Sequence, residues 1–520
     1  MNRHQFSISN FKWFDFAHHK LSILSILCLV ACAASIVNSQ SAIVNLPREM
    51  ATASISRGER VFRAGAAASN ITPPLDEPVV GGWSSPPGTH VHDELYVKAL
   101  VLDDGRTRLA FVVCDNLGLG REVCDAAKEI IHEKTGIAKE NILISATHTH
   151  SSISATGPNR LVRENELSPY QQFLVRRIAD GVRRAVNNLA PAKVGWGSAQ
   201  EPTQVFNRRY FMKPGTPTPN PFGGQDQAVM NPGRGNANIL KPAGPTDPQV
   251  AFLSVRSADG RQIALLANYS LHYVGGVQGG AMSADYYGMF ADRIQQLLGA
   301  DRLDPPFVGI MSNGTSGDIN NIDALNKEQK RYAPYEKMRE VANLVAQAVY
   351  DAHGKIEFHD WVPLGAMQEE LTLAVRKPTE QQVAYARSML AKPADAKPYH
   401  QHEKVYGSRV LQLQESPDEV AVILQAFRVG DLAICAIPFE VFVEIGLEIK
   451  AKSPFAQAFT ISHANGSYGY LPTPAQHKLG GYETWLGTNR VEFEASTKII
   501  RSLMSMSERL RAGADSAAGR

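Results

Sequence analysis

Cysteine is scarce in this 520-residue chain, which holds only five. Beyond the N-terminal region Cys114, Cys124 and Cys435 remain, and these are too few and too scattered for a disulfide framework or a thiolate metal site. An excess of one charge is also lacking, because 53 Lys and Arg nearly balance 51 Asp and Glu to leave +2. That balance implies neither nucleic acid nor an acidic polymer as a partner.

The first forty residues have the pattern of an export signal. Basic residues precede the apolar run Leu21–Ala34, which is short for a bilayer span, and small polar residues follow at Ser35–Ser41. We therefore expect a signal peptide over residues 1–39 and a linker over residues 40–62. No later segment is long and apolar enough to cross a membrane.

Three outcomes for this signal stay open. Leu29–Cys32 is similar to a bacterial lipobox, in which case Cys32 becomes the lipidated first residue of the mature chain. Otherwise cleavage falls near Ser39. An uncleaved anchor is the third option, disfavoured because the apolar run is too short. In each case the folded part leaves the cytoplasm and is periplasmic, secreted or lipid-anchored to the cell envelope, where an anchor would give peripheral membrane association.

The rest of the chain reads as one large domain. No low-complexity linker or repeat divides residues 63–510, and 44% hydrophobic residues supply a large core. A polar tail over residues 511–520 is expected to fray. The spacing predicts a strand over Leu109–Asn116, an amphipathic helix over Arg121–Thr135 and a strand over Asn141–Thr147, which together make a βαβ unit with parallel strands.

Further strands joined by tight turns make the predicted sheet mixed. They are Val250–Arg256 with Gln262–Tyr269, and Val420–Val429 with Leu432–Ile437. The fold class is therefore α/β, a mixed β-sheet core with helices packed on it. The expected helices are Pro169–Leu189, Asp285–Leu298, Lys327–Ala352, Glu380–Leu390, Val441–Lys452 and Glu492–Leu510. Phe211–Asp247, rich in Pro, Gly and Asn, is predicted to be a long loop that lines or covers the functional site.

Two apolar strands end in histidines. One leads to His148 and His150, and the other to His272. Because side chains two apart on an extended segment point to the same face, His148 and His150 can both reach one point beyond the strand. Neutral imidazole is the commonest metal ligand, and strand ends in α/β domains are where ligands usually sit. A His-x-His pair alone also fits a hydrogen-bonded pair, so the interpretation depends on further ligands.

Two other segments allow more than one interpretation. Glu440 follows an apolar run and opens a helix, where a carboxylate is either a ligand or a stabilising charge at the helix N-terminus. The loop Ser312–Asp318 lacks the Gly-x-Ser-x-Gly order of a nucleophile elbow and the Lys of a phosphate-binding loop. A glycine-rich strand end beside a metal is the more economical account.

Taken together, these pieces resemble the catalytic domain of the neutral, non-lysosomal ceramidases, secreted or membrane-associated zinc amidases that cleave the N-acyl bond of ceramide. The shared elements are a Thr-His-Thr-His-Ser strand end, a strand ending in His, a Pro-x-Glu strand end, a tyrosine-rich element and a Tyr-Glu dipeptide. In this chain they occupy Thr147–Ser151, His272, Pro438–Glu440, Tyr468–Thr473 and Tyr482–Glu483, in the family's order.

The resemblance implies one Zn²⁺ per chain, held by His148, His272, Glu440 and Tyr470. Two imidazoles, a carboxylate and a phenolic oxygen suit Zn²⁺, and a position left for water makes such a site catalytic. The activity implied is hydrolysis of an amide by metal-activated water. The substrate is expected to be an N-acyl lipid or another small N-acyl compound.

Four more side chains receive roles from the resemblance. His150, beside the metal, suits proton transfer near neutral pH, and Tyr482 corresponds to a tyrosine near the scissile carbonyl. Arg208 corresponds to a substrate-contacting arginine. Asn320 stands where the family's Gly-Asp-Val-Ser-Pro-Asn loop has its serine, so hydroxyl chemistry is excluded there, while an amide can still hydrogen-bond substrate.

Departures from the family pattern keep two alternatives open. Asn70 replaces an acidic residue of the family, and after Trp485 the chain has only a helix and a tail where most members continue into an immunoglobulin-like domain. A drifted pocket would give a metal-dependent esterase or phosphoesterase. A non-catalytic ligand-binding relative is the second alternative, and the oligomeric state stays open.

Overall fold

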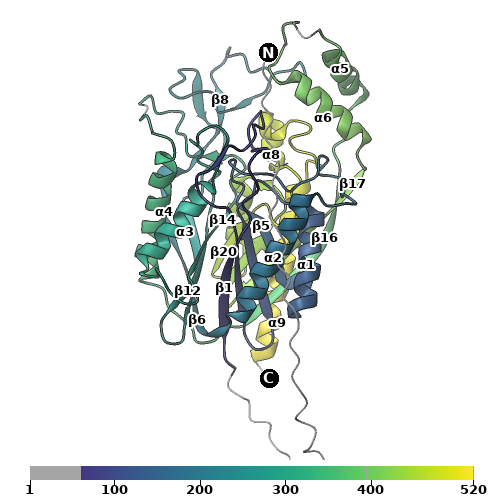
Figure 1. Ribbon diagram of the computed structural model, residues 1–520. Helices are drawn as coiled ribbons and strands as arrows, with labels where there is room; N and C mark the ends of the chain where they lie inside the picture. Colours follow the sequence, from purple (N-terminus) through teal and green to yellow (C-terminus); the bar gives the residue numbers. More distant parts are fainter. Residues whose placement is uncertain (1–59, 329, 394, 519–520) are drawn as a thin grey trace, which may run out of the picture. The chain divides into compact units, whose positions relative to one another are not determined.

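Two β-sheets packed face to face form the centre of the fold in this computed structural model, which describes residues 60–328, 330–393 and 395–518 (Figure 1). The strands of the larger sheet are β1 Arg63–Asn70, β3 Tyr96–Asp103, β4 Arg108–Cys114, β5 Ile142–Ala146, β6 Ala190–Gln200, β11 Gln249–Ser257, β12 Gln262–Tyr269 and β14 Val308–Asn313. Those of the smaller sheet are β16 Leu364–Ala374, β17 Glu419–Val429, β18 Leu432–Ala436 and β20 Gln457–Ile461. Their orders are β14-β12-β11-β6-β1-β3-β4-β5 and β16-β17-β18-β20.

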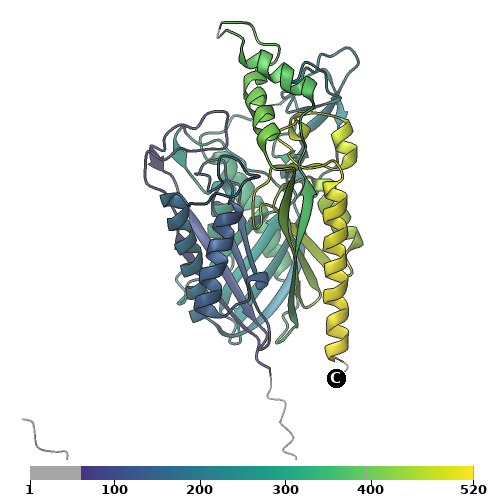
Figure 2. The same cartoon turned by 90° about the vertical axis from the view of Figure 1, so that its right-hand side faces the viewer.

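Helices cover the outer faces of both sheets. The helices of the described part are α1 Arg121–Thr135, α2 Pro169–Asn187, α3 Asp285–Leu297, α4 Glu336–His353, α5 Glu380–Leu390, α6 Glu403–Glu415, α7 Val443–Lys452, α8 Pro474–Lys478 and α9 Ala495–Ala518, of which α5, α6 and α8 lie at one end of the fold, beyond the sheets (Figure 1). On the larger sheet, α1 and α2 pack over β1, β3, β4 and β5, whereas α3 and α4 pack over the other half. The long helix α9 lies against β16 and β17 of the smaller sheet (Figure 2). The described residues therefore form one compact unit of four layers, helix, sheet, sheet and helix.

Short elements complete the end of the fold that carries the predicted site residues. The strands are β2 His90–Val91, β7 Phe206–Asn207, β8 Arg209–Met212, β9 Ala228–Met230, β10 Ile239–Pro242, β13 Ala281–Met282, β15 Ile319–Asn320, β19 Glu440–Val441 and β21 Tyr470–Leu471. Single helical turns of 3-10 type are η2 Pro202–Gln204 and η3 Tyr482–Thr484, whereas a third, η1 Lys139–Asn141, lies at the start of β5, away from His148.

The predicted βαβ unit is confirmed. β4 and β5 pair in parallel and α1 crosses between them with the predicted bounds. The helix buries Val123, Ala127 and Ile131 on one face, as its spacing requires, and ends before Gly136, whose φ of 71° is the left-handed conformation that glycine adopts without strain. The two predicted antiparallel hairpins are also present, so the fold is α/β with mixed sheets.

A junction inside the larger sheet positions the functional end. β1 and β6 pair through only two residues each, at the starts of both strands. The parallel and antiparallel pairings between β5 and β12 add up so that these two strands run in opposite directions. In a flat sheet the segments that follow them would lie at opposite ends. They meet instead, since the ring centroids of His148 and His272 are 4.9 Å apart. The sheet must therefore bend at the β1–β6 junction.

Two predicted elements are wrong. The helix expected over Lys327–Ala352 begins only at Glu336, because Pro334 disfavours a helical residue before it and Tyr335 takes a φ of 66°. The segment Phe211–Asp247 is not one structureless loop, since β8, β9 and β10 form a three-stranded sheet within it. These strands have three or four residues, too few for an alternating pattern to be recognised.

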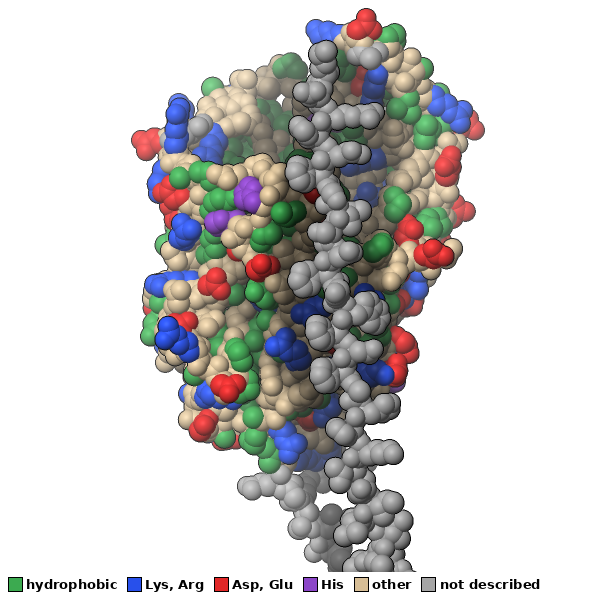
Figure 3. Space-filling view, viewed as in Figure 1, with side chains coloured by type: hydrophobic (Ala, Val, Ile, Leu, Met, Phe, Trp, Pro, Cys, Tyr) green, Lys and Arg blue, Asp and Glu red, His purple; other side chains and the backbone are tan. Residues whose placement is uncertain are grey.

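The expected signal peptide, the lipobox at Cys32 and all but the end of the expected linker lie outside the described residues. Within the part that is described, no helix combines the length and the apolarity needed to cross a bilayer. Basic and acidic side chains are interspersed over the face shown in Figure 3, in keeping with the balanced composition.

Candidate metal centre

His148 is placed by the end of β5, although not through an extended backbone. Its φ is 66°, in the left-handed region, and its backbone N–H donates to Asn116 O at 3.0 Å. The expectation that His148 and His150 lie on one face of a straight strand is therefore wrong in its geometry. The two side chains nevertheless converge, with their Nε2 atoms 3.1 Å apart.

His148 and His272 are each oriented by a backbone carbonyl. His148 Nδ1 lies 2.6 Å from Leu117 O, and His272 Nδ1 lies 2.9 Å from Ser316 O. Because a carbonyl oxygen only accepts, each Nδ1 carries the hydrogen, and each Nε2 presents a lone pair to the centre. His272 Nε2 is buried and has no hydrogen-bond partner. This is how histidines that ligate a metal are usually held.

His150 completes a group of three imidazoles. Ligand nitrogens of His148, His150 and His272 all lie within 4.8 Å of one another. The ring of His150 stacks on Tyr273 at a centroid distance of 3.7 Å, and a Cβ on Gly81 would come within 2.6 Å of the same ring. His150 is thus clamped between a tyrosine face and a glycine backbone, with its Nδ1 buried and unpartnered.

Glu440 and Tyr470 reach the same place from a two-stranded parallel pairing. β19 pairs with β21 so that Glu440 stands opposite Tyr470. Glu440 Oε2 lies 3.4 Å from His148 Nε2 and makes no hydrogen bond, although the side chain is only 8% exposed. Arg208 Nη2 donates to the Tyr470 hydroxyl at 2.9 Å. All four residues named as ligands from the sequence therefore share one region with His150.

The donor set fits a divalent cation such as Zn²⁺. Leaving a buried polar atom unpaired costs about 1–3 kcal/mol, and this centre contains three such atoms, His150 Nδ1, His272 Nε2 and Glu440 Oε2. Imidazole nitrogens with carboxylate and phenolic oxygens are borderline ligands of the kind that zinc accepts. Among the described residues, the three histidines are the one cluster of His, Cys, Asp or Glu that meets the geometry of a metal site.

Burial and neighbouring charges set the protonation of the centre. Burial, followed by nearby positive charges, lowers the pKa of His150 and His272 well below the usual value, so both rings are neutral at pH 7. Burial would raise the pKa of Glu440, but the neighbouring histidines, His148 first, hold it well below its usual range. Burial raises the pKa of Tyr470 well above that of a free tyrosine. Neutral imidazoles beside a carboxylate are the protonation state in which these groups bind metal.

Arg208 is fixed by a fully buried acid that the sequence did not single out. Glu483 accepts from Arg208 Nε at 2.8 Å and from Arg209 Nη1 at 2.7 Å, and it is completely buried. Burial would raise the pKa of Glu483, but the two guanidinium charges keep it lowered. The acid thus holds Arg208 rigidly against Tyr470.

Tyr482 and Asn320 have different neighbours. The Tyr482 ring is 5.7 Å from that of Tyr470, at 75°, and burial raises the pKa of its hydroxyl. Asn320 makes no hydrogen bond to a predicted ligand. Its Nδ2 donates to Asn231 Oδ1 at 2.7 Å and its Oδ1 accepts from Ile322 N at 2.9 Å.

Sequence reasoning missed His463. Its ring stacks on His148 at a centroid distance of 4.1 Å and an angle of 14°, and both of its ring nitrogens are buried without partners. His463 follows the apolar strand β20 by two residues, which is the same pattern that pointed to His148 and His272. That pattern could have identified it.

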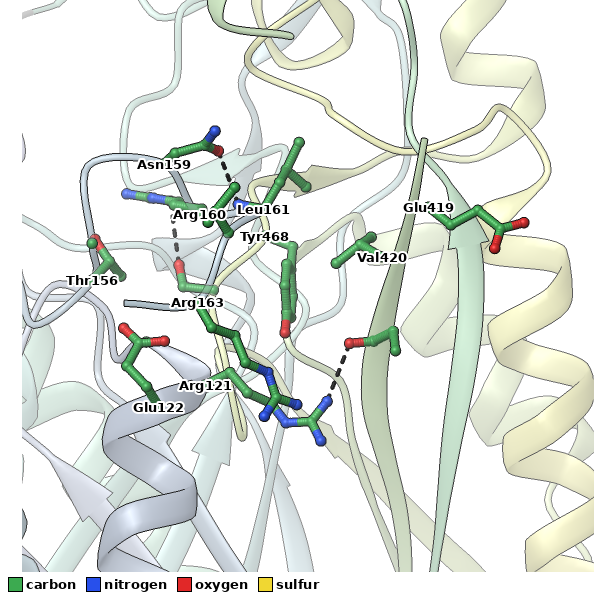
Figure 4. A pocket seen from close by; sticks show the side chains of 15 residues that line it. Arg121, Glu122, Thr156, Asn159, Arg160, Leu161, Arg163, Glu419, Val420 and Tyr468 are labelled. Atoms are coloured by element: carbon green, nitrogen blue, oxygen red, sulfur yellow. Dashed lines mark hydrogen bonds between the residues drawn. The ribbon is translucent and has the colours of Figure 1, made fainter. Parts of the chain in front are cut away.

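Two cavities lie near this end of the fold. One, of about 550 Å³, is bordered by Tyr482 and by residues of the segment Phe211–Asp247. The other, of about 140 Å³, lies at the start of α1 (Figure 4). Its three arginines are already partnered, since Arg160 donates to Ser467 Oγ, Arg121 pairs with Glu370 and Arg163 pairs with Asp125.

Known proteins with similar features fall in one group. The sequence model described as neutral/alkaline non-lysosomal ceramidase, N-terminal, matches residues 62–331. The crystal structure of neutral ceramidase from Pseudomonas aeruginosa has the same fold, with a TM-score of 0.64 at 16% identity over 87% of this chain and 75% of that one. A ceramidase complexed with C2 gives a TM-score of 0.63 at 16% identity over 87% of this chain and 76% of that one.

Proposed function

This chain belongs to the neutral/alkaline non-lysosomal ceramidase family and is a ceramidase-like hydrolase, and we propose that it cleaves an amide (N-acyl) bond with a zinc-activated water. The observation that carries the proposal is the convergence of three imidazoles and a carboxylate oxygen without a hydrogen-bond partner in one place. We assign His148, His272, Glu440 and Tyr470 as the residues that would hold the metal.

Zn²⁺ held there would act as a Lewis acid on the acyl oxygen and make water nucleophilic at neutral pH. His150 is neutral and its Nε2 lies 3.1 Å from His148 Nε2, so it can accept a proton from the attacking water and pass it to the leaving amine nitrogen. No described residue bonds to the Tyr482 hydroxyl, which stays protonated because its pKa is raised. It is therefore free to donate to the oxygen on which negative charge develops.

Arg208 has a binding role in this scheme. Its guanidinium is anchored by Glu483 and by the Tyr470 hydroxyl, so it presents a fixed donor array beside the centre. Asn320 acts indirectly, because its amide hydrogen-bonds to Asn231 and so positions that residue, which lines the larger cavity. We propose that Asn320 influences the substrate through Asn231.

An N-acyl lipid, or a smaller N-acyl compound, is the proposed substrate. Support comes from the family and from the ceramidase complexed with C2, which has the same fold. We further propose that residues 1–39 direct export to the periplasm, the medium or a lipid-anchored position, and that residues 63–510 carry the activity.

A panel of matched substrates tests this function. Zinc-loaded protein is assayed on an amide, an ester and a phosphoester that share the same alkyl groups. The highest kcat/KM is expected on the amide, and His272→Ala should abolish turnover while His132→Ala, an exposed histidine on α1, retains it. Preferred cleavage of the ester or the phosphoester would replace amide hydrolysis with one of the alternatives, and absence of any turnover would favour a binding protein.

A further inference from the structure

The cavity of about 550 Å³ beside Tyr482 is built from three separate parts of the chain. One wall comes from the three-stranded sheet around β8, and another from residues 399–402 at the start of α6. These two elements lie at the same end of the fold (Figures 1 and 2). The third wall is residues 481–485, and Trp83 stands at the rim with 56% of its surface exposed.

Aromatic rings line much of this cavity. Trp83 stacks on His402 at a centroid distance of 3.5 Å, and it meets Tyr482 at 6.0 Å and 72°. Tyr482 meets Trp485 at 5.9 Å and 74°, and His400 meets Trp485 at 5.2 Å and 90°. Trp83 and His402 are thus nearly parallel, whereas Tyr482 is steeply inclined to Trp83 and to Trp485, and His400 is perpendicular to Trp485.

One negative charge stands in this aromatic setting. Asp226 is the only Asp, Glu, Lys or Arg among the residues that line the cavity. Its carboxylate accepts from Asn220 Nδ2 at 3.0 Å and from Trp485 Nε1 at 2.7 Å, and no described Lys or Arg forms an ion pair with it. Burial lowers the pKa of His400 and His402, so neither ring neutralises the carboxylate at pH 7.

Large branched aliphatic side chains are sparse in these walls. No Leu, Ile or Phe lines the cavity, and the non-aromatic apolar residues are Ala228, Val229, Met230 and two prolines. A cation, by contrast, is attracted by the faces of Trp and Tyr within about 6 Å and by a nearby carboxylate.

We propose that this cavity binds an organic ammonium group, so that the preferred substrates are N-acyl compounds that carry a second, positively charged amine beyond the scissile bond. The part of this statement that concerns hydrolysis rests on the proposed function, whereas the ammonium site rests on the cavity alone. These positively charged substrates differ from a ceramide, which has two long alkyl chains.

Choline and 3,3-dimethylbutan-1-ol are the probes, since a neutral carbon in the second replaces the charged nitrogen of the first. Isothermal titration calorimetry on the full-length protein should show choline binding roughly tenfold or more tightly than the neutral isostere. Asp226→Asn should reduce that preference to about threefold or less, while Asp323→Asn, an acid outside the cavity, should keep it. Equal binding of the two probes, or an unchanged preference in Asp226→Asn, would overturn the proposal.

Trp83→Leu is a second variant, chosen because this half-exposed ring can be removed without opening the core. It should weaken choline several-fold and the neutral isostere much less. Weakening of both probes by the same factor would count against an ammonium site.

Hydrolysis of a paired set separates this proposal from the proposed function. The kcat/KM of an N-acyl diamine is compared with that of an N-acyl alkylamine of equal length, in wild type and in Asp226→Asn. The wild type should prefer the diamine. In Asp226→Asn this preference should be smaller because the KM for the diamine rises. Choline binding that depends on Asp226, with no amide cleaved, would refute the function and support the site. Amide cleavage that favours the neutral compound, with no choline bound, would support the function and overturn the site.

Discussion

Replacing Glu483 by Gln removes a buried negative charge that two arginines share. Both the acid and Arg209 are fully buried, and the side chain of Arg208 is 6% exposed. Removing one partner of a buried pair typically costs about 3–5 kcal/mol, because the remaining charge is left uncompensated. We expect the lower end, about 3 kcal/mol, since Gly480 O, Gln476 and the Tyr470 hydroxyl still accept from the two guanidiniums.

Urea unfolding measures this loss as a shift of the midpoint at constant slope. Glu133→Gln is the matched control, because its ion pair with Lys134 is exposed on α1 and its removal should leave the midpoint unchanged. A Glu483→Gln protein as stable as the wild type would refute the argument that this acid holds Arg208 and Arg209.

The same variant has a defined pH dependence. The folded pKa of Glu483 is lowered, so its contribution is complete above the unfolded value of about 4.3 and is lost as pH falls through the folded pKa. The difference in unfolding free energy between wild type and Glu483→Gln should therefore be constant from pH 7 to about 5 and shrink below about pH 4. A difference that grows on acidification would contradict this sign.

Three further outcomes are expected. Gly81→Ala should lower activity and metal affinity, because the φ of Gly81 is 123° and an added Cβ would lie 2.6 Å from the His150 ring. The control Gly82→Ala should have a mild effect, since its Cβ would meet no atom closer than 3.6 Å; equal effects of the two variants on kcat/KM would refute the packing of Gly81 against His150. Ser168→Ala removes the capping box at the start of α2 and should lower the unfolding free energy by about 1 kcal/mol in urea titrations, with activity retained; an unchanged midpoint would show that the cap contributes nothing. Chelation of zinc should lower the melting temperature and re-addition of zinc should restore it, since a ligand at 100 times its Kd stabilises the folded protein by about 2.7 kcal/mol. Thermal unfolding curves that coincide with and without chelator would count against a resident metal.

Local patterns predicted local structure well. The bounds of α1 follow from its buried stripe and from Gly136, and the hairpins follow from short turns between apolar runs. The sequence does not predict which strands share a sheet, because an apolar run pairs equally well with many partners. The smaller sheet around β17 and the bend between β1 and β6 are set by tertiary packing and appear only in the structure.

The candidate site residues were predicted from strand ends and from the family resemblance, neither of which predicts their arrangement. The hydrogen bond from His148 N to Asn116 O accompanies a left-handed backbone, a conformation that histidine adopts more often than most residues but still too rarely to be expected at one position. His463 carried the same strand-end pattern and was passed over because it lies outside the motifs that resemble the family. Glu483 was visible only as part of a dipeptide, since its role comes from two arginines far away in sequence.

The central claim, a single zinc ion between His148 and His272, is tested most directly by an anomalous difference map at the zinc edge from crystals of zinc-loaded protein. The account predicts one strong peak about 2.0–2.1 Å from the Nε2 atoms of both histidines, with Glu440 within bonding distance. A map with no peak there, or with its peak elsewhere in the fold, would contradict the account.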